Sequence, residues 1–484
     1  MTTHGFRARF LHWCEVFLLA SAIAGALASV VNGLRELQLP VQSNYEEGNV
    51  LNAAVRITHG LTPYPDPRAY PNVLNPYGPV PYYLMAIPVK FWGLSFTVPR
   101  LLILGCGVLI SLLLVLLVRC WAESWLLALG FGLFYLCTRT VHNWLFLLRV
   151  DLIAAVLTLA GFCVFALRPR RWAWAVLLFA AALFTKQTAL AAPAACFLYL
   201  LAQKEWRRAA AFAALLAGLG TTGLVAMHVW THGAFTFMMF RAHPDPSSLR
   251  HLWMVIGIAA PGLLLVAPLG LALLLVAREK FLLARLYLIL ATALVLITAS
   301  KEGSSPNHFL EPLAVYCLCA ALTYQQMKSL PQVQRVLPLI PVGLGIAALY
   351  FVGVGTETRL HHAELLSGCP DIYQYVRAAP GQRILSEDIS AVLLSGKPVQ
   401  VSNPFVYTQL VEHSGFSKEP VEGLVERQEY DLIVVSKEMY WLKRGSSDRW
   451  WPSLAQAMVR NYRVARVATC FDGGFVLAPR GRQP

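Results

Sequence analysis

Residues 98–118 read VPRLLILGCGVLISLLLVLLV, a stretch in which Arg100 is the single charged residue. A helix that crosses the hydrocarbon core of a bilayer needs about 20 mainly apolar residues, so this stretch predicts a membrane-spanning helix. Further apolar runs occupy 10–31, 125–142, 150–167, 173–185, 187–202, 208–228, 251–277, 284–299, 308–325 and 336–355. The predicted fold class is an α-helical polytopic membrane protein with about eleven transmembrane helices.

The composition divides the chain into two parts. Of its 484 residues, 57% are hydrophobic and 14% are charged, whereas an ordinary soluble domain carries about a quarter charged residues. Of the 26 acidic residues, 12 precede residue 356 and 14 follow it. We therefore expect a transmembrane domain over 1–355, including a first outer loop at 32–97, and a small water-soluble domain over 356–484.

The C-terminal part shows the pattern of a small α/β domain. Short β-rich runs stand at 383–386 and 430–435, and a closing pair of strands is expected within 463–478. Helices are expected at 388–395 and 452–460. The domain has no Gly-rich phosphate loop. This favours a packing or acceptor-docking role over an independent enzyme.

Basic residues indicate the orientation in the membrane. They cluster in alternate turns between the apolar runs: Arg7 and Arg9; Arg119; Arg168, Arg170 and Arg171; Lys204, Arg207 and Arg208; Arg278, Lys280 and Arg285; Lys328 and Arg335. The positive-inside rule then predicts a cytoplasmic N-terminus and, after an odd number of spans, an extracytoplasmic C-terminal domain. The net charge of +14 thus reflects membrane topology, and no nucleic-acid partner is expected. Short loops with such a domain are typical of a bacterial inner-membrane protein.

Cysteine usage leaves one question open. Ten cysteines occur, and eight lie in or beside apolar runs, where cysteine behaves as a small hydrophobic residue. Cys369 and Cys470 both fall in the predicted extracytoplasmic domain, whose compartment permits a disulfide. The sequence does not decide between a disulfide and two free thiols.

Two adjacent carboxylates, Glu46 and Glu47, follow the first apolar run. Charged carboxylates beside hydrocarbon are costly and therefore rare, which marks them as candidate functional groups. A carboxylate there can take a proton from an attacking hydroxyl. Alternatively, both acids belong to the N-terminus of a helix that begins near Val50 and interact with its dipole.

Basic residues on the predicted outer side form a second group of candidate functional residues. They are Arg56, Arg100, Arg149, Lys186 and Lys301. Side chains of this kind bind a lipid phosphate through charge-assisted hydrogen bonds, or they extend to lipid headgroups without a specific substrate. As a set they favour a phosphate site, with Lys186, Arg149, Arg56 and Lys301 as the candidate ligands.

Other polar residues near the ends of the apolar runs complete the predicted site. Asp151 either forms an interface salt bridge with Arg149 or orients substrate beside the glutamates, and it is therefore included with Glu46 and Glu47 among the candidate catalytic residues. His308 and Glu311 are three residues apart and can share a helical face, but two such residues do not make a metal site. The candidate substrate-binding residues are Tyr77, Asn307, His308 and Glu311. A divalent metal is left as a possible cofactor.

These segments together resemble the GT-C superfamily of membrane glycosyltransferases, in its protein O-mannosyltransferase and aminoarabinose-transferase-like (family 39-like) branch. The resemblance spans most of 1–355 and is carried by YEEGNVLNAAVRITHGLTPY (45–64), NPYGPVPYYL (75–84), LRVDLIAAVLTLAG (148–161), LFTKQTALAAPAA (183–195) and GSSPNHFLEP (303–312). The family's acidic motif is usually Asp-Glu with the base first, so the resemblance implies that Glu46 is the base and Glu47 its neighbour. The family's basic residue before proline is replaced by Asn75, so phosphate binding is expected from Lys186 and Arg149.

The resemblance implies sugar transfer from a polyprenyl-phosphate donor to a hydroxyl of a glycan, lipid or protein acceptor, with inversion at the anomeric carbon. Two other functions stay open. One is a polysaccharide polymerase or ligase that uses a diphosphate-linked donor. The other is a transporter or flippase of lipid-linked oligosaccharides, which would be expected to carry its ionisable residues near the middle of the membrane.

Overall fold

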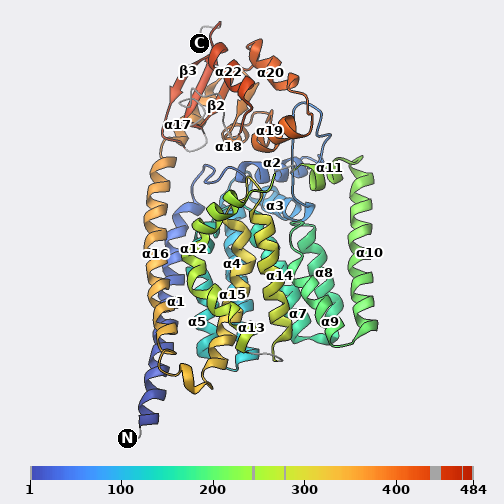
Figure 1. The fold of residues 1–484 in the computed structure, drawn as a ribbon. Helices are drawn as coiled ribbons and strands as arrows, with labels where there is room; N and C mark the ends of the chain where they lie inside the picture. Colours follow the sequence, from blue (N-terminus) through green and yellow to red (C-terminus); the bar gives the residue numbers. More distant parts are fainter. Residues whose placement is uncertain (1–2, 243–245, 277–279, 437–448, 471–472, 482–484) are drawn as a thin grey trace.

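The computed structural model describes residues 3–242, 246–276, 280–436, 449–470 and 473–481. Long helices run side by side in a bundle, and a small domain caps one end of it (Figure 1). We call this the domain end of the bundle. The N-terminus lies at the opposite end.

Helices account for all the predicted apolar runs. The long bundle helices are α1 (Thr3–Leu37), α4 (Thr97–Ala122), α10 (Trp206–Trp230), α12 (Leu249–Leu271), α14 (Leu282–Ala299), α15 (Leu310–Met327) and α16 (Leu339–Leu366). The shorter ones are α5 (Trp125–Cys137), α6 (Arg139–Trp144), α7 (Asp151–Leu167), α8 (Trp172–Leu183), α9 (Ala191–Ala202) and α13 (Leu273–Val276).

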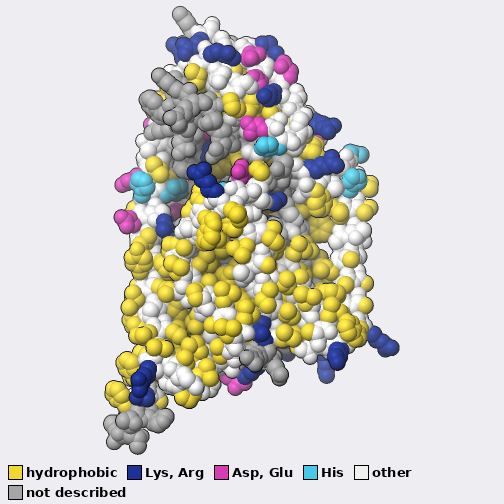
Figure 2. All heavy atoms as spheres, in the orientation of Figure 1, with side chains coloured by type: hydrophobic (Ala, Val, Ile, Leu, Met, Phe, Trp, Pro, Cys, Tyr) yellow, Lys and Arg dark blue, Asp and Glu magenta, His cyan; other side chains and the backbone are white. Residues whose placement is uncertain are grey.

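Six helical stretches among the described residues are long and apolar enough to cross a membrane: Phe6–Leu37, Thr97–Ala122, Trp206–Trp230, Leu249–Val276, Leu282–Ala299 and Leu339–Ala378. Three further helices, α5, α7 and α9, are apolar but shorter. Hydrophobic side chains cover the body of the bundle, and Lys and Arg gather toward its two ends (Figure 2). The protein is thus a multi-pass helical membrane protein, whereas the count of eleven spans stays a prediction.

The 32–97 loop is largely ordered into helices. It contains α2 (Glu47–Thr58) and α3 (Pro79–Trp92), which lie at the domain end of the bundle (Figure 1). Pro79 begins α3, where its missing N–H costs no hydrogen bond. Gly78 just before it donates its N–H to the Thr185 carbonyl, so the loop is fastened to the segment between α8 and α9. A short helix, α11 (Ala234–Arg241), lies at the same end.

The C-terminal domain contains a four-stranded sheet in the order β1-β2-β4-β3, which confirms the expected strands. The strands are β1 (Ile384–Ser386), β2 (Leu432–Val435), β3 (Tyr462–Val467) and β4 (Phe475–Pro479). β1 and β2 are parallel, with Leu385 opposite Ile433, and the other pairs are antiparallel. The helices are α17 (Cys369–Ala378), α18 (Ile389–Leu393), α19 (Pro404–His413), α20 (Glu419–Glu426) and α22 (Pro452–Asn461).

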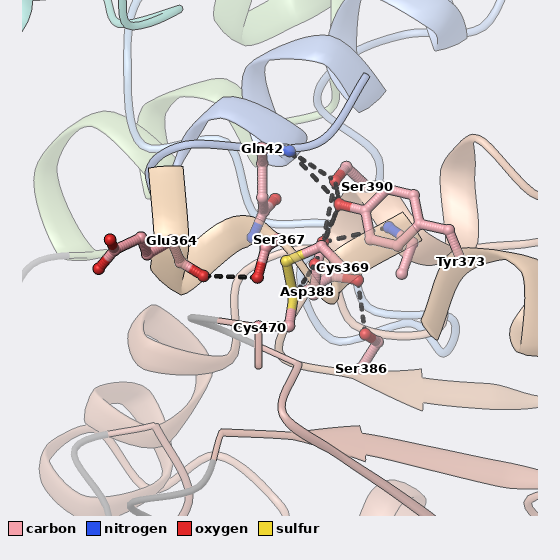
Figure 3. Close-up of a disulfide and its surroundings, with 10 residues drawn as sticks. Gln42, Glu364, Ser367, Cys369, Tyr373, Ser386, Asp388, Ser390 and Cys470 are labelled. Atoms are coloured by element: carbon pink, nitrogen blue, oxygen red, sulfur yellow. Dashed lines mark hydrogen bonds between the residues drawn. A yellow bond between two sulfur atoms is a disulfide. The ribbon is translucent and has the colours of Figure 1, made fainter. Parts of the chain in front are cut away.

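The boundary after residue 355 that the composition predicts falls within a continuous helix. The apolar run ends near residue 355, but α16 continues unbroken to Leu366 and only then gives way to the domain. Cys369, at the start of α17, is joined to Cys470 by a disulfide (Figure 3). Next to it, the Tyr373 hydroxyl accepts the N–H of Gln42 from the 32–97 loop, at 3.3 Å. The domain is therefore attached both to α16 and to that loop.

Candidate active site

A cavity of about 430 Å³ lies where the bundle meets the C-terminal domain. Its walls come from the 32–97 loop, Arg149 just before α7, the α8–α9 connection, the segment 298–308 and the C-terminal domain. A smaller cavity of about 40 Å³ adjoins it, shares Lys186, Asn307 and His308, and reaches Asp151 and Glu311. The large cavity brings together residues more than 350 positions apart in the chain.

Glu46 stands at the N-terminal end of α2 and lines the large cavity. Its Oε1 accepts a hydrogen bond from Nδ2 of Asn403, at 3.0 Å. Its Oε2 is buried and has no hydrogen-bond partner among the described residues. A buried carboxylate oxygen of this kind is costly unless a group outside the chain completes its hydrogen bonding. Glu46 therefore has one carboxylate oxygen whose hydrogen bonding is incomplete, in a residue that lines the cavity.

Glu47 occupies a different environment although it is the next residue. It is 0% exposed, forms an ion pair with Arg100 at 2.8 Å and accepts backbone N–H groups from Ser43, Asn44 and Leu148. Both of its oxygens are used, and it does not line either cavity. Between the two predicted catalytic glutamates, the geometry favours Glu46 as the residue that meets a substrate. Arg100 is paired with Glu47 and lines neither cavity, so it is not a candidate phosphate ligand.

Asp151 is the first residue of α7 and is almost fully buried. Its Oδ1 accepts hydrogen bonds from Nζ of Lys186, at 2.6 Å, and from Nδ2 of Asn307, at 2.8 Å. Arg149 Nε lies 3.5 Å from Oδ2, so the predicted salt bridge is present, and Lys186 forms a second ion pair with the same carboxylate. Asp151 orders two basic side chains at the cavity wall, while its possible catalytic role remains a prediction.

The remaining candidates divide by position. Tyr77, Lys301, Asn307 and His308 line the large cavity together with Glu46, Arg149 and Lys186. Glu311 lines the smaller cavity and accepts a hydrogen bond from the Tyr287 hydroxyl, at 2.8 Å. Arg56 lines neither cavity, because it lies in the last turn of α2 and donates to the Thr62 carbonyl.

The C-terminal domain supplies residues that the sequence did not single out. Phe405, Val406 and Arg449 line the cavity, and the Arg449 guanidinium lies 4.3 Å above the Tyr45 ring. Asn403 contacts Glu46 from just behind that wall. The Asn403-Pro404 pair is a recognisable helix start, but nothing local indicates that it approaches residues 45 and 46.

One grouping of three potential metal ligands occurs among the described residues, formed by Cys369, Asp388 and Cys470. Two of its members are joined in the disulfide, so their sulfurs are not available as thiolates for a metal. The grouping thus includes the disulfide itself (Figure 3), and none of its three members lines the cavity.

The arrangement of helices is similar to that of solved membrane transferases. ArnT from Cupriavidus metallidurans, in a structure bound to undecaprenyl phosphate, matches with a TM-score of 0.62 and 13% identity over 94% of this chain and 97% of that chain. The oligosaccharyltransferase AglB from Archaeoglobus fulgidus, in complex with an inhibitory peptide and a dolichol-phosphate, matches with a TM-score of 0.54 and 13% identity over 96% and 75%. No protein-family model and no curated protein sequence matches this chain.

The comparison confirms the resemblance stated from the sequence at the level of fold. The chain has the GT-C fold, in which a helical bundle carries a small C-terminal domain at one end.

Proposed function

We propose that this protein is a membrane glycosyltransferase that moves a sugar from a polyprenyl-phosphate donor to a hydroxyl of a glycan, lipid or protein acceptor. The observation that carries the proposal is that a carboxylate and two basic side chains line one cavity. Glu46, whose Oε2 has no hydrogen-bond partner among the described residues, lines the same space as Arg149 and Lys186. The first group suits proton abstraction and the others suit a phosphate, which are the two needs of this reaction.

In the proposed reaction, Glu46 Oε2 takes the proton of the acceptor hydroxyl as its oxygen attacks the anomeric carbon of the sugar. A new carbon–oxygen bond forms while the bond from that carbon to the donor phosphate oxygen breaks. The lipid phosphate leaves with the electron pair, and the configuration at the anomeric carbon inverts. Lys186 and Arg149 would stabilise the negative charge that develops on the leaving phosphate.

The charges of the cavity support a phosphate-bearing donor. Four basic residues line the large cavity, namely Arg149, Lys186, Lys301 and Arg449. Glu46 and Glu302 are the acidic residues in the same wall. Asp151 offsets part of this positive charge from the smaller cavity. The excess of cations in a partly enclosed space favours an anionic group.

The location follows from the same proposal. The cavity lies at the domain end of the bundle, and the positive-inside pattern of the sequence predicts that this end is outside the cytoplasm. The site would then face the outer leaflet of a bacterial inner membrane, with the N-terminus in the cytoplasm. Donors with a polyprenyl tail would approach through the surrounding lipid.

The test is sugar transfer by the purified protein in lipid, with a panel of polyprenyl-phosphate sugars, diphosphate-linked glycans and crude envelope acceptors. Wild type, Glu46→Gln and the control Glu302→Gln are compared, since Glu302 is an exposed carboxylate in the same cavity wall. We expect Glu46→Gln to lose about a hundredfold or more in rate and Glu302→Gln to stay near wild type. Transfer that survives Glu46→Gln would place the base elsewhere. Turnover of diphosphate-linked donors alone would favour a polymerase or ligase. If no donor is turned over, a transporter is favoured.

A further inference from the structure

Asn403 belongs to the C-terminal domain, yet its amide reaches the carboxylate of Glu46 in the bundle part of the protein. We infer that Asn403 is a positioning residue, which holds one oxygen of Glu46 and leaves the other without a partner, ready for an acceptor hydroxyl. The inference rests on the proposed function for its catalytic meaning. It gives the C-terminal domain a direct part in assembling the site.

A short strand-like pairing places Asn403. The Asn72 N–H donates to the Gln400 carbonyl at 2.7 Å, and the Ser402 N–H donates back to the Asn72 carbonyl at 2.9 Å. The Leu74 N–H then donates to the Ser402 hydroxyl, also at 2.9 Å. The domain segment is therefore hydrogen-bonded to the 32–97 loop immediately before Asn403. Since backbone pairing fixes register, the next side chain is delivered at a defined point.

The hydrogen-bond network decides which end of the Asn403 amide faces Glu46. Asn403 is 0% exposed and precedes α19, and its Oδ1 accepts the Val406 N–H at 3.1 Å as a helix N-cap. The same oxygen accepts the Tyr45 hydroxyl at 3.2 Å, and that hydroxyl in turn accepts the Phe405 N–H at 2.8 Å. Because Oδ1 is occupied as an acceptor, Nδ2 must be the end that donates to Glu46.

This contact has a consequence for the free oxygen of Glu46. A carboxylate that lines a cavity with several cations tends to pair with one of them, as Asp151 does with Lys186. Arg149 instead donates to Asn44 Oδ1, at 2.9 Å, and Glu46 Oε1 is taken by Asn403. The amide thus holds Glu46 without adding a charge. Its Oε2 stays available for an acceptor hydroxyl.

The main test variant is Asn403→Asp. Aspartate caps a helix as well as asparagine does, so both acceptor contacts persist while the donor to Glu46 is lost. We expect kcat for sugar transfer to fall roughly 10- to 100-fold, since a hydrogen bond to a charged group is removed and the base is no longer held. KM for the donor should stay within about twofold of wild type. Asn403→Ser keeps a helix-capping side chain and adds no charge, and it should likewise lower kcat.

Ser402→Ala is the matched control. It removes the side-chain acceptor of the Leu74 N–H but keeps the backbone pairing of Asn72 with Gln400 and Ser402, so it weakens the attachment of the domain while Asn403 stays in register. If Asn403 merely attached the domain, Ser402→Ala and Asn403→Asp would lower kcat alike, and the inference would be overturned. We expect Ser402→Ala to keep kcat near wild type.

A second measurement does not depend on any donor. Thermal unfolding is followed for wild type, Glu46→Ala, Asn403→Asp and the double variant. We expect Asn403→Asp to lower the melting temperature in wild type and to have much less effect once Glu46 is alanine, because the two carboxylates then no longer face each other. Equal losses in both backgrounds would overturn the inference. A wild type that turns over no donor would overturn the proposed function, while the unfolding cycle still tests the contact.

Discussion

Arg100 donates hydrogen bonds to both carboxylate oxygens of Glu47, at 2.9 and 2.8 Å, and neither side chain is exposed to solvent. Its remaining N–H groups donate to the carbonyls of Glu36, Leu39 and Val41. The pair therefore ties the start of α4 to the chain that leaves α1 and to the N-terminus of α2. It keeps the neighbouring Glu46 at the cavity by fixing the backbone beside it.

Arg100→Met should destabilise the protein strongly. It leaves the Glu47 carboxylate buried without its cation, a change that typically costs about 3–5 kcal/mol. Thermal unfolding in detergent or lipid measures the effect. Arg35→Met is the control, because Arg35 is an exposed arginine near the end of α1. Equal melting temperatures for the two variants would contradict a structural role for the buried pair.

Lys186→Gln should weaken binding of undecaprenyl phosphate. The variant removes a cavity cation and leaves Asp151 less neutralised, so roughly a 10- to 100-fold rise in Kd is expected. Equilibrium binding with the labelled lipid measures the change. Arg56→Gln is the matched control, because Arg56 lines neither cavity and donates to the Thr62 carbonyl. If Arg56→Gln weakened binding as much as Lys186→Gln, the phosphate would not occupy this cavity.

Replacing Cys369 and Cys470 together with serine should destabilise the C-terminal domain by about 2–5 kcal/mol, because the disulfide closes a long loop in the unfolded chain. The two cysteines are 101 residues apart. Thermal unfolding with and without a reductant measures this loss. The reductant should lower the melting temperature of wild type and leave the double variant unchanged. A wild type insensitive to reductant, despite complete reduction shown by thiol labelling, would count against this stabilisation.

Gly78→Ala should disturb the segment that carries Lys186. A Cβ at residue 78 would lie 1.8 Å from the carbonyl oxygen of Phe184, which is backbone and cannot rotate away. Overpacking of this kind costs at least about 1–3 kcal/mol. We expect a lower melting temperature together with weaker binding of undecaprenyl phosphate. Gly105→Ala is the control, since a Cβ there meets no atom within 4 Å.

The sequence alone determined the architecture. Apolar runs long enough for a bilayer predicted the helices, because the hydrophobic thickness of a membrane is a local requirement on chain length. Short β-rich runs in the tail predicted strands at 383–386 and 430–435 and a closing pair within 463–478, and the structure confirms them as β1, β2, β3 and β4. The order of motifs indicated the GT-C fold, and the structural comparison confirms it.

The tertiary structure decided which of several chemically similar residues lie at the cavity and which form contacts elsewhere. Glu46 and Glu47 are adjacent and chemically identical, yet one meets the cavity and the other meets Arg100, a residue 53 positions away. Cys369 and Cys470 were compatible with either redox state until the fold brought them together. Asn403 acquired its contact with Glu46 through the pairing of distant backbones. The local sequence determines the spacing of hydrophobic residues and the preference of each segment for helix or strand. These contacts depend instead on which distant side chains the packed fold brings to each position.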